Sequence, residues 1–151
     1  MKLSGPYAMK AFSHEEIGEQ SDGKILYLIE VERLVPLESR KEYAAWDKLN
    51  DTLSRIKSGL YDKYNGEDQR FSRALEYLAN DMPEDPLKDF IEQLASFCID
   101  VNAGVDFHSK NVMKRPADGH HVCSDPVYSI EMLNELRKSH LDKYDRARFR
   151  Y

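Results

Sequence analysis

The amino-acid sequence predicts an α+β fold that is mainly helical and carries two β-hairpins. Apolar residues recur at helical spacing through most of residues 38–101. Two Asp-Gly pairs, Asp22-Gly23 and Asp118-Gly119, each lie between short segments of strand-like composition, which is a strong hairpin signal. The 151 residues include 41% hydrophobic and 32% charged residues, which is typical of one folded globular domain.

The N-terminal hairpin is predicted from two segments on either side of the first Asp-Gly pair. We expect strands at residues 7–12 and 24–31, because the second segment is rich in Ile, Leu, Tyr and Val. Residues 32–37 then form a linker, since Pro36 has no backbone N–H and ends a regular strand.

Three helices are predicted between this linker and the second hairpin. The first begins at residue 38 and ends at Gly59, and the second covers residues 69–79. The third has the clearest start, because Asp85 is a good N-cap and Pro86 occupies the first helical position. The apolar faces of all three should form the core.

A second hairpin and a last helix complete the predicted elements. Residues 111–114 and 120–124 flank the second Asp-Gly pair, so we expect a hairpin from Asn111 to Ser124. Ser129 is a candidate N-cap for a helix over residues 129–151.

The charge is unevenly distributed along the chain. The net charge is −5, but residues 137–151 carry +4, which leaves −9 for residues 1–136. An acidic body makes nucleic acid an unlikely partner. The basic tail is either a solvated helix end or a contact for phosphates or an acidic protein surface.

Neither a membrane location nor a metal cluster is expected. The longest apolar runs are far shorter than the roughly 20 residues of a membrane span, and the first ten residues have no signal-peptide pattern, so we expect a cytoplasmic protein. Cys98 and Cys123 should be free buried thiols. His120 and His121 precede Cys123 closely, but neighbouring strand residues point to opposite faces, which disfavours a shared zinc ion.

Three oxygen-bearing residues suggest phosphoryl-transfer chemistry. Asn111 follows Asp106 by five positions, and Asp125 follows the second hairpin. This order and spacing resemble the catalytic loop (H-R-D-L-x-x-x-N) and the metal loop (D-F-G) of protein kinases. The resemblance implies that Asp106 positions the acceptor hydroxyl and takes its proton, whereas Asn111 and Asp125 hold magnesium.

The residues around Asp106 and Asp125 indicate which kinase families the sequence resembles most. D-F-H-S-K-N-V-M followed by D-P-V resembles the D-x-H-x-x-N form of aminoglycoside-phosphotransferase-like kinases, and looks still closer to the early protein kinases of podoviruses, the short-tailed bacteriophages. The resemblance implies that His108 is catalytic and contacts the phosphate or the acceptor. A second interpretation is that His108 caps the loop through a ring nitrogen.

The resemblance extends to the segment before the helices. Residues 25–37, ILYLIEVERLVPL, look like the last strand of a kinase N-lobe running into the hinge, which would place Glu32, Arg33 and Leu34 at an adenine. The alternative is an ordinary strand leaving a hairpin. A single kinase-C-lobe-like domain over 1–151 would then comprise N-lobe strands (1–31), a hinge-like linker (32–37), a helical lobe with both loops (38–128), and a C-terminal helix with the basic tail (129–151).

Several parts of a kinase pattern are missing from this sequence. There is no glycine-rich loop, and Lys10 is a weak match for the nucleotide lysine because residues 7–12 fit the next strand better. Gly104 and Val105 stand where the family has His and Arg, and Pro126-Val127 replaces Phe-Gly. Only 26 residues follow Asp125, so we expect a truncated kinase-like lobe.

Two classes of function remain open. In the first, the chain is a phage-encoded pseudokinase that binds and inhibits or modulates a host protein in the host cytoplasm, with no cofactor. In the second, it is a minimal Ser/Thr phosphotransferase that uses Mg²⁺ and ATP, and a homodimer partner could complete its site. Mimicry of nucleic acid by the acidic body is a third alternative. Either main class predicts an exposed apolar surface around Tyr7, Met9, Phe12 and Tyr27.

Overall fold

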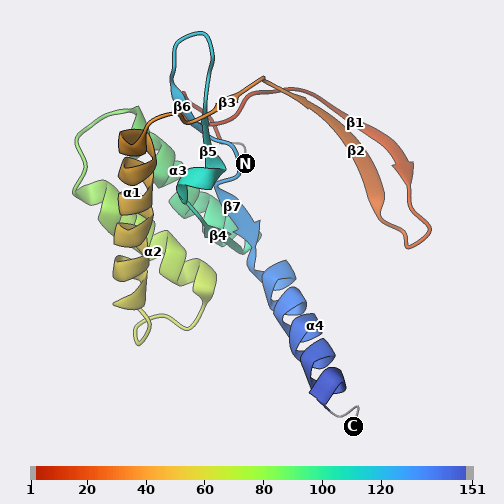
Figure 1. Ribbon diagram of the computed structural model, residues 1–151. Coiled ribbons are helices and arrows are strands. Elements are labelled where there is room, and N and C mark those ends of the chain that lie inside the picture. The colour runs from red at the N-terminus through yellow and green to blue at the C-terminus, as the bar shows by residue number, and fades with distance from the viewer. Residues whose placement is uncertain (1–2, 149–151) are drawn as a thin grey trace.

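A computed structural model describes residues 3–148, with side chains for residues 3–139, and shows an α+β fold with small antiparallel sheets (Figure 1). The helices of this part of the chain are α1 (Arg40–Ser58), α2 (Glu67–Asn80), α3 (Pro86–Val101) and α4 (Ile130–Arg148), with a short 3-10 helix η1 (Ser109–Asn111). The strands are β1 (Ala11–Glu19), β2 (Ile25–Val31), β3 (Val35–Pro36), β4 (Ala103–Val105), β5 (Val112–Lys114), β6 (His121–Cys123) and β7 (Val127–Ser129).

The helix boundaries follow local capping chemistry, and all four predicted helices are present. Ser39 caps α1 through a capping box with Glu42, and the Asp85 carboxylate accepts the N–H groups of Leu87 and Lys88 at the start of α3. At the end of α3, Asn102 adopts the left-handed conformation, with φ 49°.

The core lies where α1, α2 and α3 meet the loop that follows β4. Its largest fully buried side chains are Phe90, Phe107, Leu53, Leu75, Ile91, Leu94, Val122 and Cys98. Every helix of this group contributes, and Phe107 comes from the loop itself. The loop is therefore fixed by the core that it helps to fill.

Two small sheets hold this loop at both of its ends. The β5–β6 hairpin is the predicted second hairpin, and β3 pairs with β5 on its other edge. Strand β4 pairs with β7, so Val105 lies opposite Val127. The β4–β7 pair was not predicted, nor was β3, which forms within the expected linker at residues 32–37.

The N-terminal hairpin differs from its prediction in one strand. Its turn lies at the first Asp-Gly pair as expected, but the first strand is β1 (Ala11–Glu19) and not residues 7–12. The outer half of β1 is mostly polar and solvent-exposed, so it lacks the apolar alternation that identifies a strand in sequence. The β1–β2 hairpin projects from the helical body as a separate arm (Figure 1).

Residues 3–10 pack along the body and lead into this arm. The Cys123 N–H donates to the Tyr7 carbonyl at 2.9 Å, and Ala8 forms an isolated bridge with Cys123. The Tyr7 ring lies 6.1 Å from Trp46 in edge-to-face geometry. Of the expected apolar surface, Phe12 and Tyr27 are exposed, whereas Tyr7 and Met9 are partly buried.

An ion pair joins the base of the arm to the body. The Arg115 guanidinium donates to both Glu32 carboxylate oxygens, at 2.8 and 2.9 Å. It also donates to the carbonyls of Pro6 and Ala8. Both charged side chains are largely buried, with 12% of Arg115 and 10% of Glu32 exposed, and the contact holds the arm, the N-terminal segment and the β5–β6 hairpin together.

Helix α4 extends away from the body on the other side of β7 (Figure 1). Met132 and Leu136 are exposed on it. The basic tail expected from residue 137 onward lies mostly outside the residues with described side chains. Among the described helices, none is long and apolar enough to cross a membrane.

Candidate functional site

The candidate site is the loop from Asp106 to Asn111 together with the segment at Asp125. The Asp106 N–H donates to the Pro126 carbonyl at 3.0 Å, which continues the β4–β7 ladder by one residue. The Asn111 side-chain amide donates to the Asp106 carbonyl at 3.3 Å. The Ser124 N–H donates to the Asn111 carbonyl at 2.9 Å. These bonds join Asp106 and Asn111 to each other and to the residues on either side of Asp125.

The side-chain oxygen atoms of these three residues differ in whether they already accept a hydrogen bond. The Asp106 Oδ1 accepts the His108 N–H at 2.9 Å. The Asn111 amide nitrogen is used as a donor, so its carbonyl oxygen is the atom left for a cation. Asp125 is exposed, and no hydrogen bond reaches its carboxylate within the described residues. The set offers the hard oxygen ligands that magnesium prefers.

His108 caps the loop, as the second interpretation of the sequence expected. Its Nδ1 accepts the Lys110 N–H at 3.2 Å at the start of η1. The side chain is exposed. Its Nε2 is consequently the ring nitrogen left to meet a phosphate or an acceptor.

Two residues of α1 that the sequence analysis did not single out hold the loop in place. The Asp47 carboxylate accepts the Ser109 N–H, and the Asn50 side chain accepts the Phe107 N–H, both at 2.9 Å. The hydrogen bond from Ser109 lowers the pKa of Asp47 below its ordinary value. Their signal in sequence was weak: two polar residues next to the apolar stripe of a helix, which is also the usual place for solvated side chains.

The expected adenine segment is tied to the arm. The Glu32 N–H donates to the Lys10 carbonyl at 2.9 Å, and the Glu32 carboxylate binds Arg115. Arg33 is exposed and Leu34 is partly buried. No hydrogen bond or ion pair of the described residues joins this segment to Asp106. Lys10 is exposed at the entry to β1 and not at the loop.

Packing against Tyr128 explains why a glycine occupies position 104, two residues before Asp106. A Cβ at this position would lie 2.3 Å from a ring carbon of Tyr128, which faces it across the β4–β7 pair. Burial raises the pKa of the Tyr128 hydroxyl to about 12, so the ring is neutral. A larger residue cannot occupy position 104 unless Tyr128 moves.

His121, one of the two neighbouring histidines, belongs to a hydrogen-bonded network with α1. The Trp46 indole N–H donates to His121 Nδ1 at 2.9 Å, and His121 Nε2 meets Glu42 Oε1 at 3.2 Å. No group of three or more His, Cys, Asp or Glu side chains within residues 3–139 could hold a metal ion. Cys98 and Cys123 are free and buried, as predicted, and burial raises each thiol pKa to about 12.

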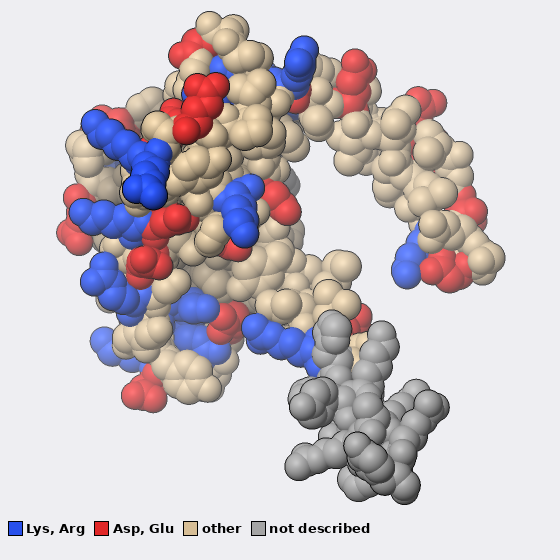
Figure 2. Space-filling view, viewed as in Figure 1, with Lys and Arg blue, Asp and Glu red and all other residues tan. Residues whose placement is uncertain are grey.

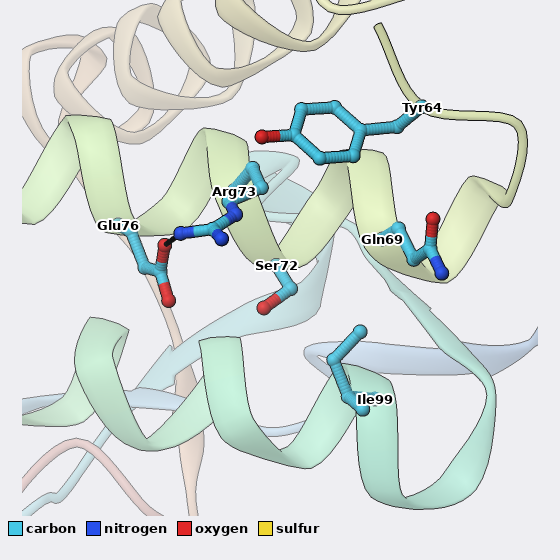
Figure 3. Close-up of a pocket in the computed structure, with 6 residues that line it drawn as sticks. All are labelled: Tyr64, Gln69, Ser72, Arg73, Glu76 and Ile99. Atoms are coloured by element: carbon cyan, nitrogen blue, oxygen red, sulfur yellow. Dashed lines mark hydrogen bonds and ion pairs between the residues drawn. The ribbon is translucent and has the colours of Figure 1, made fainter.

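Surface hollows also lie away from the loop. One lies between α2 and α3, where Arg73 and Glu76 form an ion pair at 2.7 Å beside Tyr64, Gln69, Ser72 and Ile99 (Figure 3). None of the predicted site residues lines it. A second hollow, on α1, includes Asp47 and so borders the loop.

A comparison of the chain with protein-family models, curated proteins and solved structures finds no match. The functional argument therefore depends on residue types and geometry.

Proposed function

We propose that this chain is a kinase-like binding module, a pseudokinase of the phage type, which contacts and inhibits or modulates a host protein in the host cytoplasm during infection. The observation that carries this proposal is the β1–β2 arm. Its large apolar residues are all at least 40% exposed, and Phe12 and Leu28 reach 66% and 55%. Soluble proteins rarely expose such patches unless they bind something.

The kinase-like part of the proposal is supported by the loop network. Asp106 and Asn111 are hydrogen-bonded to each other and to the backbone on either side of Asp125. The β5–β6 hairpin lies between Asn111 and Asp125, as it does between the two loops of the kinase motif. Hydrogen bonds from its backbone to Asp47 and Asn50 of α1 hold the loop, so the protein itself fixes its conformation. A binding module can retain such a loop as a rigid part of its surface.

Two elements with which a kinase holds the phosphates of a nucleotide, the glycine-rich loop and the nucleotide lysine, have no counterpart at the candidate site. The chain has no glycine-rich loop, and Lys10 does not lie at the candidate site. Charge-assisted contacts of this kind contribute about 1.5–3 kcal/mol each. We therefore expect nucleotide affinity to be poor, which favours binding over catalysis.

The second candidate function is a minimal Mg-ATP-dependent Ser/Thr phosphotransferase, and the oxygen set of the loop favours it. Asn111 and Asp125 would hold the magnesium ion, which neutralises phosphate charge when bound. Asp106 would orient the acceptor hydroxyl and take its proton. His108 Nε2 would contact the phosphate or the acceptor.

Calorimetric titration with Mg-ATP separates the two functions. For a binding module we expect no saturable heat up to about 1 mM nucleotide, which corresponds to a binding free energy of only about −4 kcal/mol. The matched control is Asp125→Ala, whose exposed side chain should leave the fold intact. Micromolar binding that Asp125→Ala removes would contradict the binding module and support the phosphotransferase.

The biological effect of the chain gives a second test of the same proposal. Asp106→Ala with Asn111→Ala removes the acceptor-orienting carboxylate and one magnesium ligand. A binding module keeps its effect on the host in this double variant, and a phosphotransferase loses it. Circular dichroism must show unchanged helix content, because Asn111 also bonds to the Asp106 carbonyl.

A further inference from the structure

We propose that the free edge of β2 pairs with β2 of a second copy of this chain, in antiparallel orientation, to form a four-stranded sheet. The inference rests on the hairpin arm alone and holds for either function of the loop. Within the described residues, β2 pairs with β1 and with no other strand. An isolated two-stranded hairpin is marginally stable in water, and further strands stabilise it.

The two edges of the hairpin differ in how well they are protected against strand pairing. Glu15, Glu16 and Glu19 lie on β1, whose pairing with β2 contains two register irregularities. Charges and bulges of this kind discourage a further strand. In β2 the run from Ile25 to Ile29 contains neither a charge nor a proline. The β2 edge is therefore the one that accepts a partner.

The arm leaves this edge accessible. Every residue of β1 and β2 is exposed, and the arm projects clear of the helices (Figure 1). Figure 2 shows acidic side chains spaced along the arm and further charged side chains near its turn. A second copy can reach the strand without displacing any part of the body.

Charge complementarity selects the second copy as the occupant and fixes the register. If Tyr27 lies opposite Tyr27 of the second copy, Lys24, which precedes β2, faces Glu30 of that copy, and the symmetry repeats this pair. Within its own hairpin Lys24 also forms an exposed ion pair with Asp22, at 3.1 Å. All pairs between are apolar: Ile25 with Ile29, and Leu26 with Leu28. Opposite charges directly across two strands stabilise a sheet.

Neighbouring registers are worse. A shift of one residue places Ile25 opposite Glu30 of the second copy, so each charge faces an apolar side chain. A shift of two places Lys24 opposite Glu32, whose carboxylate is already bound to Arg115. The strands run antiparallel, so the two helical bodies lie at opposite ends of the sheet.

Sedimentation equilibrium of the full chain tests the proposal. We expect a dimer that Lys24→Glu weakens by about tenfold, because like charges then face each other at two places. Glu30→Lys should weaken it similarly, and the double variant Lys24→Glu/Glu30→Lys should restore it. Circular dichroism of each variant checks the fold. A monomer at all concentrations, or a double variant no stronger than the single ones, would overturn the proposal.

Disulfide trapping tests the register itself. Opposite residues of antiparallel strands have Cα atoms about 4.5–5.5 Å apart, which a disulfide can span. Tyr27→Cys should therefore form a covalent dimer under mild oxidation. Ile25→Cys is the matched control, because its two copies would lie about 13 Å apart along the strands. Equal cross-linking of both variants, or none of Tyr27→Cys, would overturn the register.

Discussion

At the scale of single residues, Gly104 shows how a side chain on one strand restricts the residue opposite it on the paired strand. The space above its Cα is filled by Tyr128, so we expect Gly104→Ala to destabilise the fold by about 1–3 kcal/mol through overpacking. Chemical denaturation of the two proteins measures this difference in the free energy of unfolding.

Gly18→Ala is the matched control for this substitution. No atom lies within 4 Å of a Cβ at position 18, and the residue does not need a left-handed conformation. Its free energy of unfolding should remain close to that of the parent protein. Equal losses at positions 18 and 104 would show that Tyr128 is not the cause.

The sequence alone could identify Gly104 only as a departure from the kinase motif. Glycine is required at this position because of Tyr128, which is 24 positions away in sequence. No local pattern predicts that β4 and β7 pair. The same holds for Asp47 and Asn50, whose role appears only when α1 lies under the loop. The spacing of Asp106, Asn111 and Asp125 was visible because it is a short-range feature.

At the scale of elements, the start of α1 combines a helix cap with an acid-sensitive contact. The Glu42 carboxylate accepts the N–H groups of Ser39 and Glu38, which, with help from His121, lowers its pKa from 4.5 to about 2. A carboxyl whose pKa is lowered by folding stabilises the fold above its ordinary pKa, and this contribution is lost as the pH falls toward 2.

We therefore expect Glu42→Gln to lower stability at neutral pH and to flatten the dependence of stability on pH between about 4.5 and 2. Urea denaturation at a series of pH values gives the slope for both proteins. An unchanged slope in this window would mean that other carboxyl groups account for the acid sensitivity.

Local chemistry also explains which elements were predictable. Asp85 and both Asp-Gly pairs act through neighbours in sequence, so the start of α3 and both hairpin turns were correct, whereas α1 and α2 each begin two residues from their predicted starts. Strand β1 was misplaced because Ile17 is the only large apolar residue of its outer half, which leaves no alternation to identify it. Strand β3 was missed because two residues carry no period, and only its pairing with β5 defines it.

At the scale of the whole molecule, Arg115 determines how the arm is attached. Its guanidinium joins Glu32 to the carbonyls of Pro6 and Ala8 in a nearly buried site. Arg115→Ala would leave the Glu32 charge buried without a partner, so we expect a loss of about 3 kcal/mol. Residues 3–10 should also become sensitive to protease.

Arg33→Ala provides the comparison for this variant. Arg33 is exposed and adjacent to the same glutamate, so its removal should change the free energy of unfolding by less than about 0.5 kcal/mol. If Arg115→Ala is equally mild, and residues 3–10 stay resistant to protease, the ion pair is not what fastens the arm.

The contact between Trp46 and His121 gives the protein a built-in optical probe. The sequence holds a single tryptophan, and its indole N–H bonds to an imidazole from the β5–β6 hairpin. All tryptophan fluorescence of the protein therefore arises at the junction between α1 and that hairpin. The emission wavelength and quantum yield depend on whether the indole is shielded from water and hydrogen-bonded. Any loosening of the β5–β6 hairpin, which connects Asn111 to Asp125, can therefore be followed in unlabelled protein.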